Sequence, residues 1–304
     1  MTDPQAYLNG NFVPASQAVV PAVDGGFVQG TTVAEQLRTF GGELFRLDDH
    51  LDRLFRSLAI VDVNPGLTAG EFARVAEELV AHNRALLSAG DDLALTMFVT
   101  PGAYPPMVPG KSGGATVCMH TFPLRFDLWA LKYKRGELLA TTNVAQVPTA
   151  CWPPELKCRS RMHYYLADKE AATRYPNSRA LMLDENGFVT ETTTANIVLY
   201  EHGTGLVMPP RQKILPGISL AALLELAEQL EIECVERDLT PAEVANADEA
   251  FLTSTSPCML PVARFNGQAI GEAVPGKIYQ RLLSAWGELV GVDIAGQAAR
   301  FSVR

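Results

Sequence analysis

The 304-residue chain has a composition that excludes several broad classes of protein. Its hydrophobic residues make up 47% of the chain and its charged residues 19%, which is a normal globular balance with room for two domains. No uncharged apolar run reaches the roughly 18 residues that a membrane-spanning helix requires, and the amino terminus predicts no secretory signal. The net charge of −9 argues against a generic nucleic-acid binder, although it is compatible with a small anionic ligand.

The five cysteines form no CxxC pair. Scattered cysteines of this kind predict reduced thiols and a cytoplasmic protein.

The first third of the chain mixes helix and strand patterns. Asp48 or Asp49 is expected to cap a helix, and the Pro- and Gly-rich loop 101–114 is long enough to indicate a functional loop. A short apolar stretch at 44–47 is followed by predicted helices over 51–58 and 72–87 and predicted strands at 93–100 and 115–120.

The pattern loosens around Pro123, which predicts a boundary between a small N-terminal α/β domain (residues 1–122) and a larger domain (residues 123–304). The fold class expected from these elements is α+β, in two unequal domains. The elements predicted in the second domain are a strand at 137–142, a helix over about 159–175, strands at 180–183 and 197–200, a helix opened by Pro216-Gly217, a strand at 250–253 and an amphipathic helix over 278–289.

Lys157 stands where a rigid segment with Trp152 and two prolines meets a predicted helix. A lysine in such a place is usually a solvated surface residue. Arg159 and Arg161 would lower the pKa of its amine if they lay near it, as a lysine that forms a Schiff base requires. The local sequence therefore makes Lys157 a candidate without excluding a surface role.

A second group of candidates begins at Glu191. Alone, this residue is an ordinary strand carboxylate, and its charge would gain importance only in a dry pocket. The segment 214–219 opens a helix, whose free N–H groups suit an anion, but an ordinary N-cap explains Ser219 equally well. Residues 253–256 offer further hydroxyl groups, which is a weak signal in isolation.

Arg53 lies off the apolar stripe of its predicted helix, as a surface arginine would. The neighbouring acids and His50 do not predict a metal site, because acids are favoured at a helix start and no second cluster completes a ligand set. No metal is expected.

Taken together, these segments resemble the class IV (fold type IV) aminotransferases, which use pyridoxal 5'-phosphate (PLP). That family includes branched-chain aminotransferases, D-amino-acid aminotransferases, R-selective amine transaminases and aminodeoxychorismate lyase. The resemblance covers nearly the whole chain through six loose motifs in the family's order. They are residues 24–38, 45–54, 154–161, 191–196, 214–219 and 253–255, followed by Pro261-Val262 and Asn266-Gly267.

The resemblance implies a role for each candidate. Lys157 would carry PLP as a Schiff base and then transfer protons, and Glu191 would partner the pyridine nitrogen. Leu215 would pack on the ring, and Arg161 would lie near the cofactor's hydroxyl edge. The implied phosphate contacts are Arg53, Ile218, Ser219, Ser254 and Thr255, and the suggested substrate positions are Ala34, Gln36, Arg38 and Ser256. A homodimer is implied as well.

Several residues depart from the family's pattern. Leu220 replaces the arginine of the usual Gly-Ile-Thr-Arg. Ala34 replaces an aromatic residue that is common in branched-chain and D-amino-acid enzymes, and Gln36 is unusual. Residues 100–102 lack the arginine of the D-amino-acid type. The departures at Ala34, Gln36 and residues 100–102 bear on the substrate, and Ser219 preserves a hydroxyl where the family has threonine.

The function implied is transamination between an amino acid, branched-chain or otherwise hydrophobic, and a 2-oxo acid such as 2-oxoglutarate. Arg38 favours that type, whereas residues 45–53 favour the R-selective amine transaminases. The alternatives are therefore an R-selective amine or D-amino-acid transaminase and, more distantly, aminodeoxychorismate lyase. A non-catalytic or metal-dependent protein on the same scaffold is disfavoured, because both Lys157 and Glu191 are present. The sequence does not decide the stereochemistry of the substrate.

Overall fold

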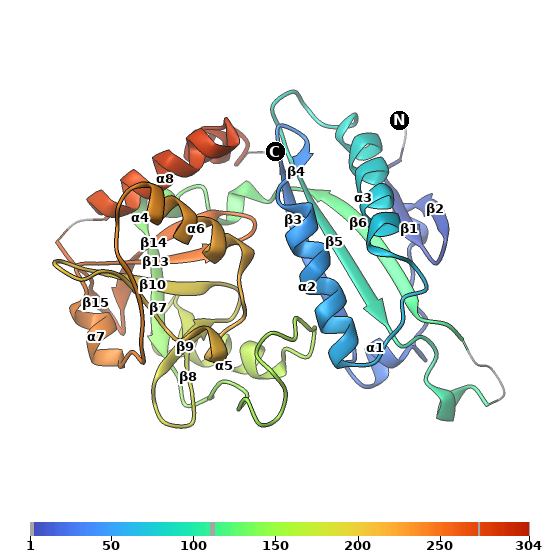
Figure 1. Ribbon diagram of the computed structural model, residues 1–304, viewed down its shortest axis with the longest axis horizontal. Coiled ribbons are helices and arrows are strands. Elements are labelled where there is room, and N and C mark those ends of the chain that lie inside the picture. The colour runs from blue at the N-terminus through green and yellow to red at the C-terminus, as the bar shows by residue number, and fades with distance from the viewer. Residues whose placement is uncertain (1–2, 110–112, 273, 304) are drawn as a thin grey trace. The chain divides into compact units, whose positions relative to one another are not determined.

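The computed structural model describes residues 3–109, 113–272 and 274–303, and the chain divides into two compact units (Figure 1). Unit 1 comprises Met1–Leu124 with Leu156–Ser160, and unit 2 comprises Arg125–Glu155 with Arg161–Arg304. The division expected at 122/123 differs in that residues 156–160 belong to unit 1. The reason is backbone pairing, since Ala34 N–H donates to the Lys157 carbonyl at 3.0 Å.

Unit 1 is built on an antiparallel sheet of six strands in the order β2-β1-β6-β5-β3-β4. Strands β5 and β6 come from the apolar runs predicted at 93–100 and 115–120, whereas β3 and the short outer strands were not predicted. The strands are β1 (Gln5–Leu8), β2 (Asn11–Pro14), β3 (Val33–Phe40), β4 (Glu43–Leu44), β5 (Leu93–Thr100) and β6 (Thr116–Pro123).

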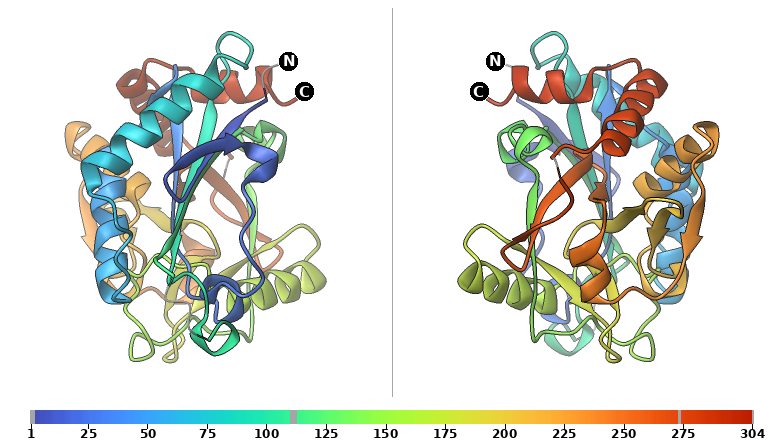
Figure 2. Two further views of the ribbon diagram at one scale, coloured as in Figure 1. Left: turned by 90° about the vertical axis from the view of Figure 1, so that its right-hand side faces the viewer. Right: turned by 90° about the vertical axis from the view of Figure 1, so that its left-hand side faces the viewer.

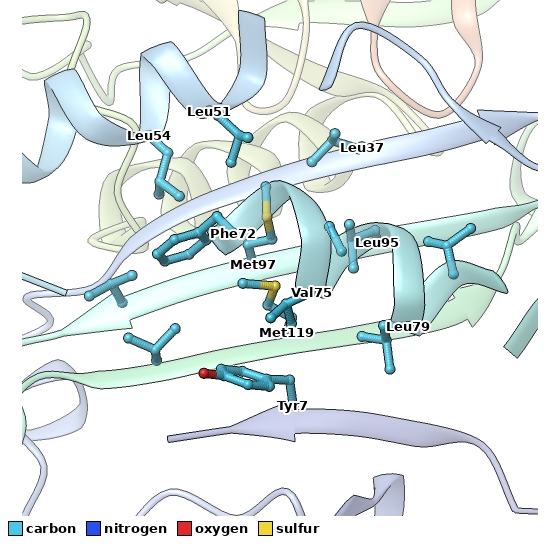
Figure 3. Packing of buried hydrophobic residues seen from close by; sticks show 14 of the residues in the cluster. Tyr7, Leu37, Leu51, Leu54, Phe72, Val75, Leu79, Leu95, Met97 and Met119 are labelled. Atoms are coloured by element: carbon cyan, nitrogen blue, oxygen red, sulfur yellow. The ribbon is translucent and has the colours of Figure 1, made fainter. Parts of the chain in front are cut away.

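Two helices, α2 (Leu47–Ile60) and α3 (Ala69–Arg84), cover one face of this sheet, while α1 (Gly25–Val28) is a single turn. Thr68 and Glu71 form a capping box at the start of α3. Figure 3 shows the core between helices and sheet. Its labelled members are Tyr7, Leu37, Leu51, Leu54, Phe72, Val75, Leu79, Leu95, Met97 and Met119.

The start of α2 differs from the sequence prediction. Strand β4 ends at Leu44, and Arg46, in the left-handed conformation, is the N-cap in place of Asp48 or Asp49. The two aspartates lie in the first turn, where their charge complements the helix dipole without capping.

Unit 2 contains nine strands, eight of them in the order β12-β11-β10-β13-β14-β7-β8-β9, with β15 beside β14. Strand β9 also pairs with β10, where Glu191 lies opposite Asn196, so six strands form a closed ring. The strands are β7 (Glu137–Thr141), β8 (Arg179–Leu183), β9 (Val189–Thr192), β10 (Asn196–Glu201), β11 (Gly205–Met208), β12 (Cys234–Glu236), β13 (Glu249–Ser254), β14 (Cys258–Phe265) and β15 (Gln268–Ala269).

Helices pack on several sides of the unit 2 strands. α5 packs on β7 and β8 through small residues such as Ala167 and Ala171, and α6 and α8 both contact β13. In Figures 1 and 2, α5 and α8 lie at opposite ends of the unit. The helices are α4 (Lys132–Arg135), α5 (Met162–Arg174), α6 (Ile218–Gln229), α7 (Pro241–Asn246), α8 (Lys277–Val290) and α9 (Ile294–Arg300).

Helix α5 begins at Met162, three residues later than the prediction of about residue 159. The preceding segment is extended because its backbone pairs with Thr32, just before β3, and with Ala34 in β3. Arg159 N–H donates to the Thr32 carbonyl at 2.8 Å. No helix in the described part of the chain is both long and apolar enough to cross a membrane.

Candidate active site

Lys157 lies in unit 1, beside the start of β3. Its backbone N–H donates to Ser57 Oγ at 3.2 Å, and its carbonyl accepts the Ala34 N–H. Its ammonium Nζ donates to the Ala34 carbonyl at 3.1 Å. The lysine is therefore partly buried and held by the sheet, unlike the solvated surface lysine that its local sequence also allowed.

A buried cluster of charged and polar side chains lies between β3 and α2. Glu35 is 0% exposed and Arg53 is 3% exposed. Arg53 donates from Nε to Oε1 at 2.7 Å and from Nη2 to Oε2 at 2.8 Å, and His50 Nδ1 lies 2.8 Å from Oε2. Arg53 is thus held in a two-point ion pair, which fixes its orientation.

Burial alone would raise the pKa of Glu35, but the positive charges of Lys157 and Arg53 and the hydrogen bonds hold it well below its ordinary value. Burial lowers the pKa of His50, so the imidazole stays neutral near pH 7 and donates from Nδ1. Glu35 is therefore an anion between Arg53 and Lys157. The sequence analysis gave it no role, although an acid between the apolar residues of a buried strand is a signal that could have been used.

Three suggested substrate positions share one face of β3. Side chains alternate along a strand, so Ala34, Gln36 and Arg38 point away from the face that carries Glu35. Ala34 is buried. Arg38 donates from Nε to the Thr39 carbonyl at 3.1 Å and stacks on Phe40 at 3.9 Å, as a structural arginine does.

Glu191 lies in unit 2 on β9 and is 6% exposed. Four donors surround its carboxylate. Oε2 accepts from Asn196 Nδ2 at 3.0 Å and from the Leu215 N–H at 3.2 Å. Oε1 accepts from Gln146 Nε2 and from the Tyr164 hydroxyl, both at 3.2 Å. The structure thus brings Glu191 and Leu215 together, and it adds three residues that the sequence analysis had assigned no role.

The start of α6 lies against Asn196. Gly217 is the N-cap and lacks a side chain to bond the free N–H groups of Ile218 and the residues after it. A Cβ at Gly217 would lie 2.0 Å from Asn196 Oδ1, so only glycine permits this approach. Ser219 is buried in the first turn.

Thr253 adds a second sign of an anion site. It is 2% exposed, and its Oγ1 has no hydrogen-bond partner among the described residues. Thr253 lies opposite Asn196 in the β10–β13 register, so both side chains are on the same face of the sheet. A buried hydroxyl without a partner is costly unless a ligand completes it.

The remaining candidates lie at the ends of elements in unit 2. Ser254 donates its hydroxyl to the Thr194 carbonyl at 2.9 Å, and Thr255 and Ser256 follow it in the turn to β14. Arg161 is the N-cap of α5, and its Nε is buried without a hydrogen-bond partner among the described residues. The cofactor and substrate roles of all these residues stay predictions. The described residues contain no group of three metal-ligating side chains.

Comparison with known proteins places the chain in a family. The family model described as Amino-transferase class IV matches residues 17–265. A protein of Methanocaldococcus jannaschii, provisionally named a branched-chain-amino-acid aminotransferase, is 31% identical over 277 residues, 91% of this chain and 93% of its own length. A D-alanine aminotransferase of Bacillus licheniformis is 28% identical, over 91% of this chain and 94% of its own length.

Solved structures of branched-chain aminotransferases are similar to this chain over nearly its whole length. The branched-chain aminotransferase of Thermoproteus uzoniensis, determined with norvaline, is 26% identical with a TM-score of 0.82, and the match covers 95% of this chain and 96% of that one. A T.th. branched-chain amino acid aminotransferase complexed with N-(5'-phosphopyridoxyl)-L-glutamate has a TM-score of 0.84 at 23% identity, covering 96% of this chain and 95% of that one.

These matches confirm the expected α+β fold of the fold type IV enzymes. Class IV aminotransferases are PLP-dependent transaminases. With the family model matching most of its length, this chain belongs to the class IV aminotransferases.

Proposed function

We propose that this transaminase carries PLP on Lys157 and moves an amino group between a hydrophobic amino acid, branched-chain ones included, and a 2-oxo acid such as 2-oxoglutarate. The observation that supports this most is the arrangement in unit 2. There, the acid Glu191, the start of α6 and the buried Thr253 hydroxyl, which has no hydrogen-bond partner in the described part of the chain, occur together around Asn196.

The residues present fit the cofactor. Bound PLP supplies an electron sink. Glu191 offers an anion to the pyridine nitrogen, and the N–H groups at Ile218 and Ser219 with the Thr253 hydroxyl offer donors to a phosphate. In unit 1, Lys157 provides the amine for covalent attachment.

Lys157 also has the chemistry of the proton-transfer base. Once its Nζ is no longer bonded to the cofactor, the neutral amine could take a proton from the substrate Cα. It could then deliver that proton to the cofactor. Arg53 keeps its place through Glu35, and its charge suits the phosphate role proposed for it.

The start of α6 gives a test of the cofactor site proposed around Asn196. Gly217→Ala would push its Cβ into Asn196 Oδ1, which displaces the side chain that bonds Glu191 and Leu215. We expect PLP affinity to fall roughly tenfold, the size of one lost hydrogen bond to a charged group, measured by titration of the apoprotein. Gly70→Ala, in open space on α3, is the control and should leave the affinity unchanged. An unchanged affinity for Gly217→Ala would contradict the cofactor site proposed around Asn196.

Substrate preference is tested with a panel of donors. We expect L-leucine with 2-oxoglutarate to give turnover, and D-alanine and an R-arylamine to give roughly tenfold less or none, a discrimination of about 1.4 kcal/mol. Product glutamate is the measurement. The D-amino-acid alternative has support from relatives named D-alanine aminotransferase. Turnover with D-alanine alone, or with the R-arylamine alone, would replace the branched-chain proposal.

We further propose a homodimer in the cytoplasm. All five cysteines are free, as in a reducing compartment. Met162, Tyr165 and Leu166 form an exposed apolar group on α5, a feature that commonly marks contact surfaces. Sedimentation equilibrium measures the assembly directly.

A further inference from the structure

The contacts to Glu191 Oε1 come from residues outside the six family-like motifs. Tyr164 lies in the first turn of α5, and Gln146 lies in the irregular segment after β7. The backbone of Gln146 is fixed there, because its N–H donates to the Leu183 carbonyl of β8 at 2.8 Å. Gln146 Nε2 also lies 3.1 Å from the Tyr164 hydroxyl, so the two donors support each other.

The hydrogen-bond partners of the Gln146 amide determine its orientation. An ionised carboxylate only accepts, so the amide must turn its NH2 group toward Glu191. Its Oε1 then faces the other way, where it accepts the Val147 N–H at 3.1 Å and meets His163 Nε2 at 3.1 Å. His163 must therefore carry its hydrogen on Nε2. With the hydrogen on Nδ1 instead, Nε2 would be an acceptor facing an acceptor.

His163 is held in that state by its surroundings. Burial and the charge of Arg161 lower the pKa of His163, so the ring is neutral near pH 7. The ring packs on Tyr164 with centroids 4.0 Å apart, and its centroid lies 6.5 Å from that of Trp152 in a T-shaped arrangement. The imidazole thus donates from Nε2 in a fixed place and holds the amide of Gln146.

The Tyr164 hydroxyl remains protonated and therefore remains a hydrogen-bond donor. Burial and the nearby charge of Glu191 raise the pKa of its hydroxyl far above its ordinary value, so the hydroxyl keeps its proton. Removing either donor would leave Glu191 Oε1 with one fewer partner in a buried site, which is costly for an anion.

We propose that Tyr164 and Gln146 are positioning residues that aim Glu191 at the pyridine nitrogen of PLP and keep it anionic, and that His163 acts through them by orienting the Gln146 amide. The proposal rests on the proposed function, because it takes Glu191 as the partner of that nitrogen. The side chain of Gln146 connects the half-buried imidazole of His163 to the carboxylate of Glu191.

The test uses the holoenzyme with PLP labelled with 15N at the ring. In the wild type, the 15N chemical shift should be that of a protonated pyridine. In Tyr164→Phe/Gln146→Leu we expect it to move toward the unprotonated value. We also expect kcat to fall roughly 10- to 100-fold, the range seen when the outer partners of a site's ligands are removed, with KM for the donor changed less than about twofold because ground-state binding is unaffected.

Two single changes sharpen the result. Thr173→Val removes an exposed hydroxyl on the same helix and should leave both the shift and kcat as in the wild type. His163→Phe keeps a ring against Tyr164 but removes the donor, and should move the shift in the same direction as the double variant by a smaller amount.

The outcomes separate the two proposals. A wild type that takes up no PLP on Lys157 overturns the proposed function. A wild type with a protonated ring nitrogen, alongside a double variant with the same 15N shift and kcat, overturns the positioning role and leaves the function standing. If circular dichroism shows that the double variant is unfolded, Tyr164→Phe and Gln146→Leu are measured singly, and wild-type values in both overturn the positioning role.

Discussion

Replacing Lys157 by alanine should abolish covalent attachment of PLP and reduce transamination by at least about 10²- to 10⁴-fold, the contribution of a positioned proton-transfer base. The amine is the group that attaches the cofactor, and it is placed by the hydrogen bond to the Ala34 carbonyl at 3.1 Å. The measurements are mass spectrometry after borohydride reduction, which should find the pyridoxyl group on the peptide that contains Lys157, and the rate with L-leucine.

Two further variants separate the covalent role of Lys157 from the effect of its positive charge. Lys157→Arg keeps a positive charge near Glu35 but cannot form the covalent bond, so it should fold normally and be as inactive as Lys157→Ala. Lys169→Ala removes an exposed lysine on α5 and should behave as the wild type. Borohydride labelling at another lysine, or turnover by Lys157→Arg close to that of the wild type, would show that Lys157 is not the attachment site.

Glu35→Gln should destabilise the protein by about 3–5 kcal/mol, the cost of leaving one partner of a buried ion pair without its counter-charge. Arg53 is 3% exposed, and both of its bonds to Glu35 would lose the charged acceptor. Urea unfolding of the apoprotein at pH 7 measures the loss. Glu43→Gln, on the exposed side of β4, is the matched control and should change stability by less than about 0.5 kcal/mol.

The same pair predicts a dependence on pH. The pKa of Glu35 is lower in the folded protein than its ordinary value of 4.5. Its contribution is therefore fully present above about pH 5 and is lost as the pH falls through the folded pKa. The stability difference between the wild type and Glu35→Gln should be constant from pH 6 to 8 and shrink toward acid pH. A loss below 1 kcal/mol at pH 7, or a difference that grows in acid, would contradict the buried ion pair.

The parts of unit 1 that sequence could predict are those whose pattern is local. Helices α2 and α3 and strand β5 show their periodicity within a single window, and all three are present. The four-residue strands β1 and β2 are too short for alternation to be distinguished from chance, and their place in the sheet depends on β6, more than a hundred residues later.

The candidate site was predictable only in part for the same reason. Lys157, Glu191 and Ser219 lie in recognisable motifs. The role of Glu35 depends on Arg53 and His50, which lie 18 and 15 residues away on another element. Gln146 lies in an irregular segment and meets Glu191, 45 residues later, only in the folded sheet. Contacts of this kind are decided by tertiary packing, which local propensity does not contain.

The segment Leu156–Ser160 has a consequence for how the protein is made. The chain passes from unit 1 to unit 2 and back before it finally enters unit 2, so unit 1 is discontinuous in sequence. During synthesis, residues 125–155 leave the ribosome before the segment that pairs with β3 has been made. Unit 1 therefore cannot reach its full set of contacts as an independent N-terminal folding unit. A nascent chain ending at residue 124 would leave the edge of β3 that pairs with Lys157 without its partner, and an unpaired strand edge of this kind can pair with other chains.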